Sequence, residues 1–352
     1  MTKRKLLKIL QVAKRTRLNK DLLRYISNKI RNRKLRLSGS NEIAYPSSIM
    51  LELTNLCNIH CITCPRQYTY GKEMDKGCMP LDNAKQIIDE IYPYLDSIGL
   101  TGLGETFLYP HLAEIASYVK SKKKSVVISL STNANVPKFI DNAKNVLPFI
   151  DTMQISIDGI DDIYEQIRVN AKFDKLVNNI NSILPLTKEY NVDLMFNIVI
   201  TKENYSQMGQ IIEFASDLGV SYVNFNYFNL ASATDIDNEY YRFYYSDEFE
   251  TALDKAYATA NSHKNVEVTG LNFRGNSGFK KCPFPWSHFY VTWDGWLVPC
   301  CSKPFPKLMN FGNVFTDGVK NTLNSPSFIK FRESWKQNIH PKFCNKCHFI
   351  DL

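Results

Sequence analysis

Three cysteines lie close together in the segment LELTNLCNIHCITCPRQ, which spans residues 51–67. Cys57, Cys61 and Cys64 follow a short apolar run and have the spacing C-x3-C-x2-C. Iron–sulfur clusters normally take four cysteine ligands, so three thiolates from one loop can hold a cluster and leave one iron open for a small molecule. A zinc ion with His60 as its fourth ligand is the alternative, but zinc sites usually draw two ligands from each of two separated loops. The spacing therefore favours a cluster.

A second group of thiols lies near the C-terminus, with the spacings C-x17-C and C-x2-C: Cys282, Cys300, Cys344 and Cys347. Four thiolates can hold either zinc or an iron–sulfur cluster. Cys78 is expected to act as a small apolar residue. No export signal precedes these cysteines. The chain is therefore expected in the reducing cytoplasm, where clustered thiols more often bind metal or do chemistry than form disulfides.

The elements that must position these cysteines alternate along the chain. Strand-like apolar runs occur at 47–54, 97–103, 125–132, 152–158, 193–200 and 221–228, and helix-like segments at 81–95, 110–122, 136–147, 162–184 and 204–218. Strands separated by helices form βαβ units with a parallel sheet. The α/β pattern fits either an open doubly wound sheet or an incomplete barrel. From residue 265 onward the strands are short and the loops rich in Gly, Pro and Asn, which predicts a small second domain that a metal site stabilises.

The cysteine loop and the segments after the next strands together resemble the radical S-adenosylmethionine enzymes, over roughly residues 46–230. The resemblance implies a partial (β/α)6 TIM-like barrel in which the first three cysteines bind a 4Fe–4S cluster and its fourth iron binds S-adenosylmethionine. It rests further on GLGETFLYP (102–110), STNAN (131–135), SIDG (156–159) and the arginine of YEQIRVNAKFDKL. The cofactor contacts it implies are Gly104, Glu105, Ser131, Asn133, Ser156, Asp158 and Arg168. A carboxylate suits the methionyl ammonium group, and a guanidinium suits the methionyl carboxylate.

The C-terminal cysteines resemble the auxiliary-cluster extension of the same enzymes, called SPASM or twitch. Gly295 lies five residues before Cys300, as in the G-x4-C element of that extension, and the C-x2-C pair follows. This spacing implies that Cys300 is the ligand and that its neighbour Cys301 is spare. Four ligands imply one auxiliary 4Fe–4S cluster, as in the twitch type, and two clusters in all. The implied domains are a basic helical arm (1–45), a radical S-adenosylmethionine barrel (46–264) and an auxiliary-cluster domain (265–352).

The resemblance also implies a reaction. Such enzymes generate a 5′-deoxyadenosyl radical that removes a hydrogen atom from a substrate carbon, and the cofactor carries the difficult step. A fully ligated auxiliary cluster accepts an electron, which favours oxidation of a hydroxyl carbon in a carbohydrate or cyclitol, as in a dehydrogenase. Asn226 and Tyr227, at the end of the sixth strand, are the expected substrate contacts. A low-potential ferredoxin or flavodoxin is the implied electron donor.

Other functions stay open at this point. A peptide-modifying maturase is the main alternative, and a sugar epimerase or lyase would leave the oxidation state of the carbon unchanged. RNA modification would suit a basic N-terminus, but stacking on bases needs aromatic residues among the basic ones, and Tyr25 is the only aromatic residue in positions 1–40. A zinc-binding scaffold without catalytic activity is the remaining possibility.

The positive charge of the chain is concentrated at one end. Residues 1–40 hold seven Lys and seven Arg against one acid, a net charge of +13, whereas the whole chain carries +8. Apolar residues recur there mostly at four-residue steps, which predicts an amphipathic helix. Such a helix either lies on a membrane surface or packs on the body of the protein. No apolar run is long enough to predict a transmembrane helix.

Overall fold

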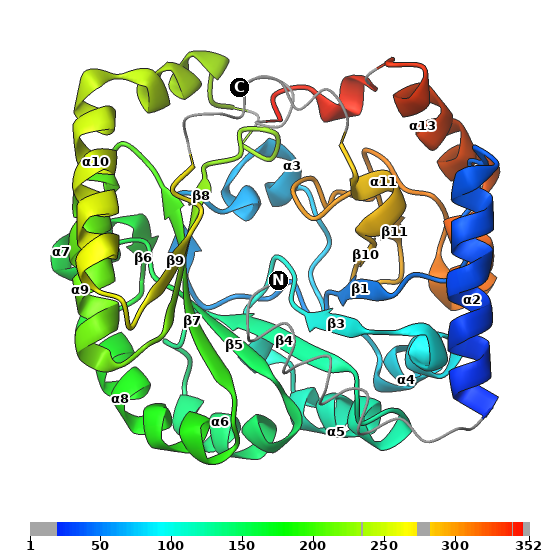
Figure 1. Cartoon of the computed structure of the whole chain (residues 1–352), viewed down its shortest axis with the longest axis horizontal. Coiled ribbons are helices and arrows are strands. Elements are labelled where there is room, and N and C mark those ends of the chain that lie inside the picture. Colours follow the sequence, from blue (N-terminus) through cyan, green and yellow to red (C-terminus); the bar gives the residue numbers. More distant parts are fainter. Residues whose placement is uncertain (1–19, 234, 273–281, 340, 348–352) are drawn as a thin grey trace.

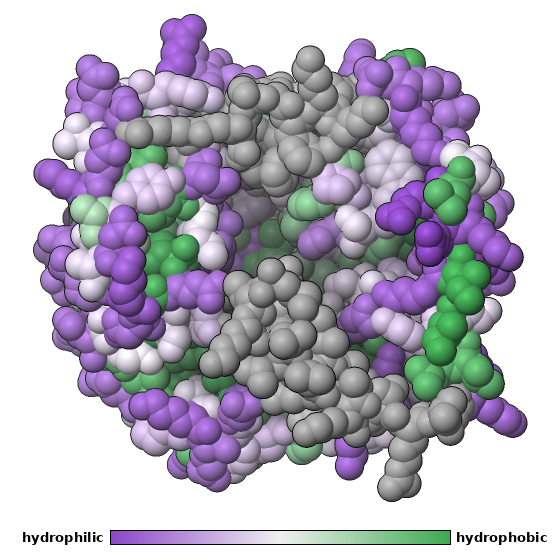
Figure 2. Space-filling model, viewed as in Figure 1, coloured by the Kyte–Doolittle hydropathy of each residue, from purple (hydrophilic) through white to green (hydrophobic). Residues whose placement is uncertain are grey.

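The computed structural model describes residues 20–233, 235–272, 282–339 and 341–347. Figure 1 shows a strongly curved sheet with helices on its outer side, and Figure 2 shows that the same face is hollowed at its centre. The basic helix α2 (Lys20–Leu37) runs along one edge of the molecule in this view. Residues 1–19 of the predicted arm lie outside the described residues.

Nine described strands form one sheet in the order β11-β10-β1-β3-β4-β5-β7-β8-β9. Their bounds are β1 (Ser48–Leu51), β3 (Ser97–Leu100), β4 (Val127–Thr132), β5 (Thr152–Ser156), β7 (Asp193–Ile200), β8 (Tyr222–Tyr227), β9 (Glu267–Thr269), β10 (Tyr290–Val291) and β11 (Leu297–Val298). Neighbouring strands are parallel except for the β10–β11 pair. A separate antiparallel pair joins β2 (His60–Cys61) to β6 (Arg168–Val169).

The remaining α-helices are α3 (Thr69–Lys72), α4 (Leu81–Ile91), α5 (Leu112–Lys122), α6 (Phe139–Val146), α7 (Asp161–Ile167), α8 (Phe173–Glu189), α9 (Met208–Leu218), α10 (Asp247–Ser262), α11 (Phe284–Ser287), α12 (Val314–Leu323) and α13 (Pro326–Lys336). Short 3-10 helices are η1 (Pro65–Gln67), η2 (Tyr92–Tyr94), η3 (Thr106–Leu108), η4 (Leu147–Phe149), η5 (Tyr205–Gln207), η6 (Asn238–Tyr245) and η7 (Lys342–Cys344).

The side-chain pattern of the strands shows which face of the sheet the helices cover. In β7 every second residue is fully or almost fully buried, and the residues between are half-buried. Phe196 belongs to the buried set and its ring stacks on Phe214 of α9 at 6.0 Å, so the buried set faces the helices. Because side chains alternate across a strand, the half-buried set faces the open interior.

The predicted partial barrel is confirmed by this arrangement. The six predicted strands are β1, β3, β4, β5, β7 and β8, adjacent and parallel in chain order. Two features were not expected: β9 extends the sheet beyond β8, and β10 pairs with β1 at the other edge. The proposed boundary at 264/265 stays a prediction, since β9 and β10 both belong to this one sheet.

The helix-like segment 162–184 proves to be two helices. Helix α7 ends at Ile167 and α8 starts at Phe173, with β6 between them. Asn170 there has a left-handed φ of 74°, which interrupts a right-handed helix. The break places Arg168 opposite Cys61 in the β2–β6 pair, so it brings an arginine to the cysteine loop.

Candidate functional site

The first cysteine loop follows β1 and carries Cys57, Cys61 and Cys64. The Cys64 N–H donates to the Cys61 carbonyl at 3.0 Å, which turns the loop tightly. Burial raises the pKa of all three thiols, that of Cys61 to about 12, and Cys57 and Cys64 add to the shift at Cys61. The thiols are thus close enough to disfavour each other's ionisation, and holding three thiolates there requires a strong positive partner such as metal.

Two arginines lie beside these thiols. Arg168 is buried, and its Nε donates to Asp158 Oδ2 at 3.0 Å. Asp158 Oδ1 also accepts from the Val199 N–H at 2.8 Å, so β7 fixes the pair. Among the described residues the terminal guanidinium nitrogens of Arg168 have no hydrogen-bond acceptor. Arg66 Nη1 is likewise buried without a partner, and Arg66 lowers the pKa of Cys57 and Cys64, although burial outweighs this effect.

The GLGE segment clamps the cysteine loop. A Cβ atom on Gly104 would lie 2.2 Å from the Thr54 carbonyl oxygen, and the Glu105 N–H donates to the Leu56 carbonyl at 2.7 Å. We expected Gly104 to admit a ligand. In the structure it admits the backbone of the cysteine loop, and any contact between Gly104 and S-adenosylmethionine stays a prediction.

The Glu105 side chain is buried. It accepts from Thr132 Oγ1 at 2.7 Å, from the Asn133 N–H at 2.6 Å and from the Phe107 N–H at 3.0 Å. Burial nevertheless raises the pKa of Glu105. A carboxylate has about four acceptor positions, so one position remains for a further donor such as an ammonium group.

The other predicted cofactor contacts lie at the carboxyl ends of β4 and β5. Asn133 Nδ2 donates to Asn58 Oδ1 at 3.0 Å and lies 3.9 Å from Cys57 Sγ. Ser131 Oγ donates to Gln154 Oε1 at 3.1 Å. Ser156 is the last residue of β5 and is half-buried on the interior side. The structure therefore brings the predicted residues to one end of the sheet, around the cysteine loop.

The interior surface beyond them is rich in amides. Asn224 Nδ2 and Asn226 Nδ2 both donate to Asn197 Oδ1 at 3.0 Å, and Thr269 Oγ1 donates to Asn224 Oδ1 at 2.8 Å. Tyr227, the second predicted substrate contact, packs edge-on against the ring of Tyr244 at 4.9 Å.

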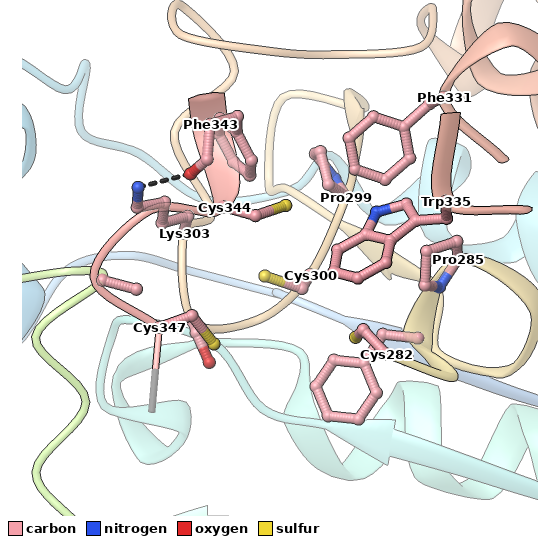
Figure 3. A pocket seen from close by; sticks show the side chains of 13 residues that line it. Cys282, Pro285, Pro299, Cys300, Lys303, Phe331, Trp335, Phe343, Cys344 and Cys347 are labelled. Atoms are coloured by element: carbon pink, nitrogen blue, oxygen red, sulfur yellow. Dashed lines mark hydrogen bonds between the residues drawn. The ribbon is translucent and has the colours of Figure 1, made fainter. Parts of the chain in front are cut away.

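The four C-terminal cysteines line a single cavity (Figure 3). Its wall is apolar and includes Phe331 and Trp335. Burial is the main cause that raises the pKa of Cys344, and Cys300, Cys347 and Cys282 add to it. The predicted set thus converges, whereas Cys301 does not line this cavity.

Lys303 connects the segment that follows Cys300 to the segment that carries Cys344 and Cys347. It is only 7% exposed, and its Nζ donates to the Phe343 carbonyl and, at 3.2 Å, to the Asn345 carbonyl. Its charge opposes the upward pKa shift of Cys344. The sequence analysis did not single out Lys303, although a basic residue three positions after Cys300 was a usable signal.

Glu52 is a second residue that the sequence analysis missed. It is fully buried on the strand side of the cysteine loop. Its Oε2 accepts from Tyr290 Oη at 2.5 Å and from the Leu103 N–H at 2.8 Å. Burial raises its pKa to about 7. Glu52 therefore links the GLGE segment to β10, and only its charge within an apolar strand marked it in the sequence.

Within the described ranges, no group of three or more His, Cys, Asp or Glu side chains is placed to hold one metal ion. His60, the alternative zinc ligand, is exposed, and its Nδ1 lies 3.4 Å from Gln67 Nε2.

Two family profiles match this chain. Residues 51–215 match the Radical SAM superfamily, and residues 282–348 match SPASM, an iron–sulfur cluster-binding domain. The chain is a radical SAM protein with a SPASM domain. Its cofactors are accordingly S-adenosylmethionine and 4Fe–4S clusters, one that binds S-adenosylmethionine and one auxiliary. The two cysteine sets described above are the groups that fit them.

Relatives of this radical SAM protein differ in what they act on. It is 22% identical to the antilisterial bacteriocin subtilosin biosynthesis protein AlbA of Bacillus subtilis, over 94% of this chain and 70% of the relative. It is 23% identical to the tungsten-containing aldehyde ferredoxin oxidoreductase cofactor-modifying protein of Pyrococcus furiosus, over 86% of this chain and 87% of the relative.

Solved structures share the fold at low identity. Streptococcus suis SuiB bound to its precursor peptide SuiA gives a TM-score of 0.67 at 15% identity, covering 91% of this chain and 74% of that one. BtrN in complex with AdoMet and 2-DOIA gives 0.52 at 15% identity, covering 84% and 89%. These likenesses support the fold and leave the substrate open.

Proposed function

We propose that this radical SAM protein oxidises a hydroxyl-bearing carbon of an uncharged carbohydrate or cyclitol. When bound, the cofactors supply a 5′-deoxyadenosyl radical for hydrogen abstraction and an auxiliary cluster as electron acceptor. The chain's own residues bind and orient the two small molecules. A low-potential ferredoxin or flavodoxin is the proposed electron donor.

The neutral side chains that β4, β5 and β8 turn toward the interior carry this proposal. The half-buried side chains of β4, β5 and β8 include serines, a glutamine and asparagines but no charged group. Amides and hydroxyls both donate and accept hydrogen bonds, as ring hydroxyls do. A charged substrate would find no partner of opposite sign on these strands, and burying an unpaired charge is costly.

The residues around the cysteine loop have separate proposed roles. The terminal nitrogens of Arg168, which Asp158 holds in place through Nε, bind the methionyl carboxylate of S-adenosylmethionine. The remaining acceptor position of Glu105 takes the methionyl ammonium group. Asn226 contacts the substrate, and its amide is oriented by Asn197. Tyr227 stays a predicted substrate contact.

The test is a substrate screen under anaerobic conditions. The reconstituted protein is incubated with S-adenosylmethionine, a reductant and a panel of neutral sugars and cyclitols, and 5′-deoxyadenosine and product masses are measured. We expect one class to stimulate 5′-deoxyadenosine formation and to yield a product two hydrogens lighter. Asn226→Leu should raise the substrate KM about tenfold by removing a hydrogen bond, whereas Asn261→Leu on exposed α10 should not. A product with unchanged mass would exclude the dehydrogenase and favour an epimerase.

A peptide maturase is the second candidate. The likeness to AlbA over 94% of this chain and the 26% identity to the sporulation killing factor maturation protein SkfB over 53% of it favour it. Asparagine side chains also pair with peptide groups. The same assay distinguishes the two candidates. If peptides encoded beside the gene stimulate 5′-deoxyadenosine formation and no sugar or cyclitol does, this proposal replaces the first.

A further inference from the structure

Helix α2 exposes a row of apolar side chains. Leu23, Ile26, Ile30 and Leu37 are 63%, 45%, 52% and 74% exposed. At about 100° per residue, these four positions fall within an arc of roughly 60° on the helix. Figure 2 shows the row as a green stripe along α2. Soluble proteins carry single exposed apolar residues commonly, but a contiguous row marks an interaction surface.

The opposite side of α2 holds the helix to the body through polar groups. Asn28 is buried; its Nδ2 donates to the Tyr45 carbonyl at 2.8 Å, and its Oδ1 accepts the Tyr45 N–H at 3.0 Å. Asn32 Oδ1 accepts from the Ala44 N–H at 3.0 Å. Asn28 and Asn32 lie about 180° around the helix from the apolar row. The body therefore fixes the row so that it points away from the protein.

Cations flank the apolar row on both sides. Helix α2 contains seven Lys and Arg residues and one acid, Asp21. Arg24 pairs with Asp21 and Lys29 with Asp96. The other five form no ion pair with any described residue: Lys20, Arg31, Arg33, Lys34 and Arg36. Within the described part of the chain, these five cations leave an excess of positive charge around the stripe.

A groove of about 670 Å³ runs beside the C-terminal half of α2. Its basic lining residues are Lys29, Arg33, Arg36 and Lys336, and its single acid is Glu42. Trp286 of α11 also lines it and is half-buried. Tryptophan has an apolar body and a polar N–H, which suits a membrane interface.

We propose that this face docks on the surface of an anionic phospholipid bilayer. The stripe enters the boundary between headgroups and acyl chains, and the flanking cations and the groove contact lipid phosphates. The body already holds the helix in its folded form, so binding pays no cost for helix formation. A second copy of the chain is the competing occupant, but two such faces would bring like charges together. Of the described helices, none is long and apolar enough to cross a membrane, so the contact is peripheral.

Vesicle flotation with the reconstituted full-length protein tests the proposal. Vesicles of pure phosphatidylcholine are compared with vesicles containing phosphatidylglycerol. We expect binding to the anionic vesicles, weakened at high salt. A variant with Leu23, Ile26, Ile30 and Leu37 all changed to Gln keeps every charge and should bind at least about tenfold more weakly. A control with Tyr245→Gln and Ile339→Gln removes exposed apolar side chains elsewhere and should bind like the wild type.

Three readings would overturn the proposal. The first is equal binding to neutral and anionic vesicles, and the second is equal binding by the four-Gln variant and the wild type. The third is complete competition by millimolar inorganic phosphate, which would indicate a phosphate-binding site and not a bilayer-binding face. Light scattering without vesicles is run in parallel. A dimer that the four-Gln variant fails to form would assign the face to a second copy. Equal iron content and circular dichroism in all variants establish that the helix change left the fold intact.

Discussion

The two cysteine regions of this protein are built around buried charges of opposite sign. Around the first loop, the carboxylates of Glu52, Glu105 and Asp158 accept hydrogen bonds from backbone N–H groups. In the auxiliary domain, buried Lys303 and Arg332 donate to backbone carbonyls instead. Both kinds of buried charge hold loops in place, because a hydrogen bond to a charged group is stronger than one between neutral groups.

The difference bears on how each region holds thiolates. The buried carboxylates alone would oppose thiolate formation, and Arg66 and Arg168 partly offset them by lowering the pKa of Cys57 and Cys64. In the auxiliary domain, the buried Lys303 that binds the loop carbonyls also supplies the positive charge, and aromatic rings form part of the cavity wall. In the first region the terminal nitrogens of Arg168 have no acceptor among the described residues, whereas in the second the four cysteines line one apolar cavity.

The largest effect is expected from Gly104→Ala. The added Cβ would meet the Thr54 carbonyl oxygen at 2.2 Å, so the cysteine loop must shift. We expect near-complete loss of S-adenosylmethionine cleavage, measured as 5′-deoxyadenosine, with the auxiliary iron retained. Gly99→Ala is the matched control, since its Cβ would meet only ordinary contacts at 3.6 Å and beyond. Normal cleavage by Gly104→Ala would show that the clamp is dispensable.

Arg168→Lys tests whether the first region binds its cofactor through a guanidinium group. Lysine cannot both keep the bond to Asp158 and present two further nitrogens to a carboxylate. We expect the KM for S-adenosylmethionine to rise roughly ten- to a hundredfold, consistent with loss of a charge-assisted hydrogen bond, with iron content unchanged. Arg242→Lys on the exposed η6 serves as the control. An unchanged KM would remove Arg168 from the cofactor site.

Lys303→Met should weaken the auxiliary region alone. It removes a buried donor to two carbonyls and a positive charge beside Cys344. We expect about tenfold faster loss of the auxiliary iron to a chelator, since a hydrogen bond to a charged group contributes about 1.5–3 kcal/mol. Lys307→Met, an exposed lysine in the same domain, should behave like the wild type. Equal loss of iron from both cysteine regions would contradict the expectation that Lys303 stabilises the auxiliary region alone.

The last prediction concerns the pH dependence of stability. Burial raises the pKa of Glu52 from 4.5 to about 7, so between these values the folded protein binds more protons than the unfolded chain. Its free energy of unfolding should therefore fall as pH rises toward 7, by about 2 kcal/mol from pH 5.5 to 7. Urea midpoints of Glu52→Gln should lack this slope. Glu90→Gln, which removes another carboxylate that accepts two backbone N–H groups, should retain it.

Much of the fold and of the first site was predictable from local patterns. The six strands alternate clearly, and the cysteine spacing marks its own loop. Arg168 was found by resemblance, but its pairing with Asp158 and its place opposite Cys61 depend on the turn at Asn170.

Contacts between distant segments were not predictable in this way. Glu52 and Tyr290 are 238 positions apart, and nothing local to either indicates the other. Helix α2 reverses the usual expectation, because Asn28 is buried while Ile26 and Ile30 are exposed. Its periodicity predicted a helix, but only the partner groups on Tyr45 decide which face turns inward.

The measurement that tests the central claim most directly is iron, sulfide and zinc content per chain after anaerobic reconstitution. The wild type is compared with a variant lacking Cys57, Cys61 and Cys64 and with one lacking Cys282, Cys300, Cys344 and Cys347. Two independent 4Fe–4S clusters predict about eight irons in the wild type and about four in each variant. Zinc in place of iron at either set, or loss of all iron from both variants, would contradict two separately held clusters.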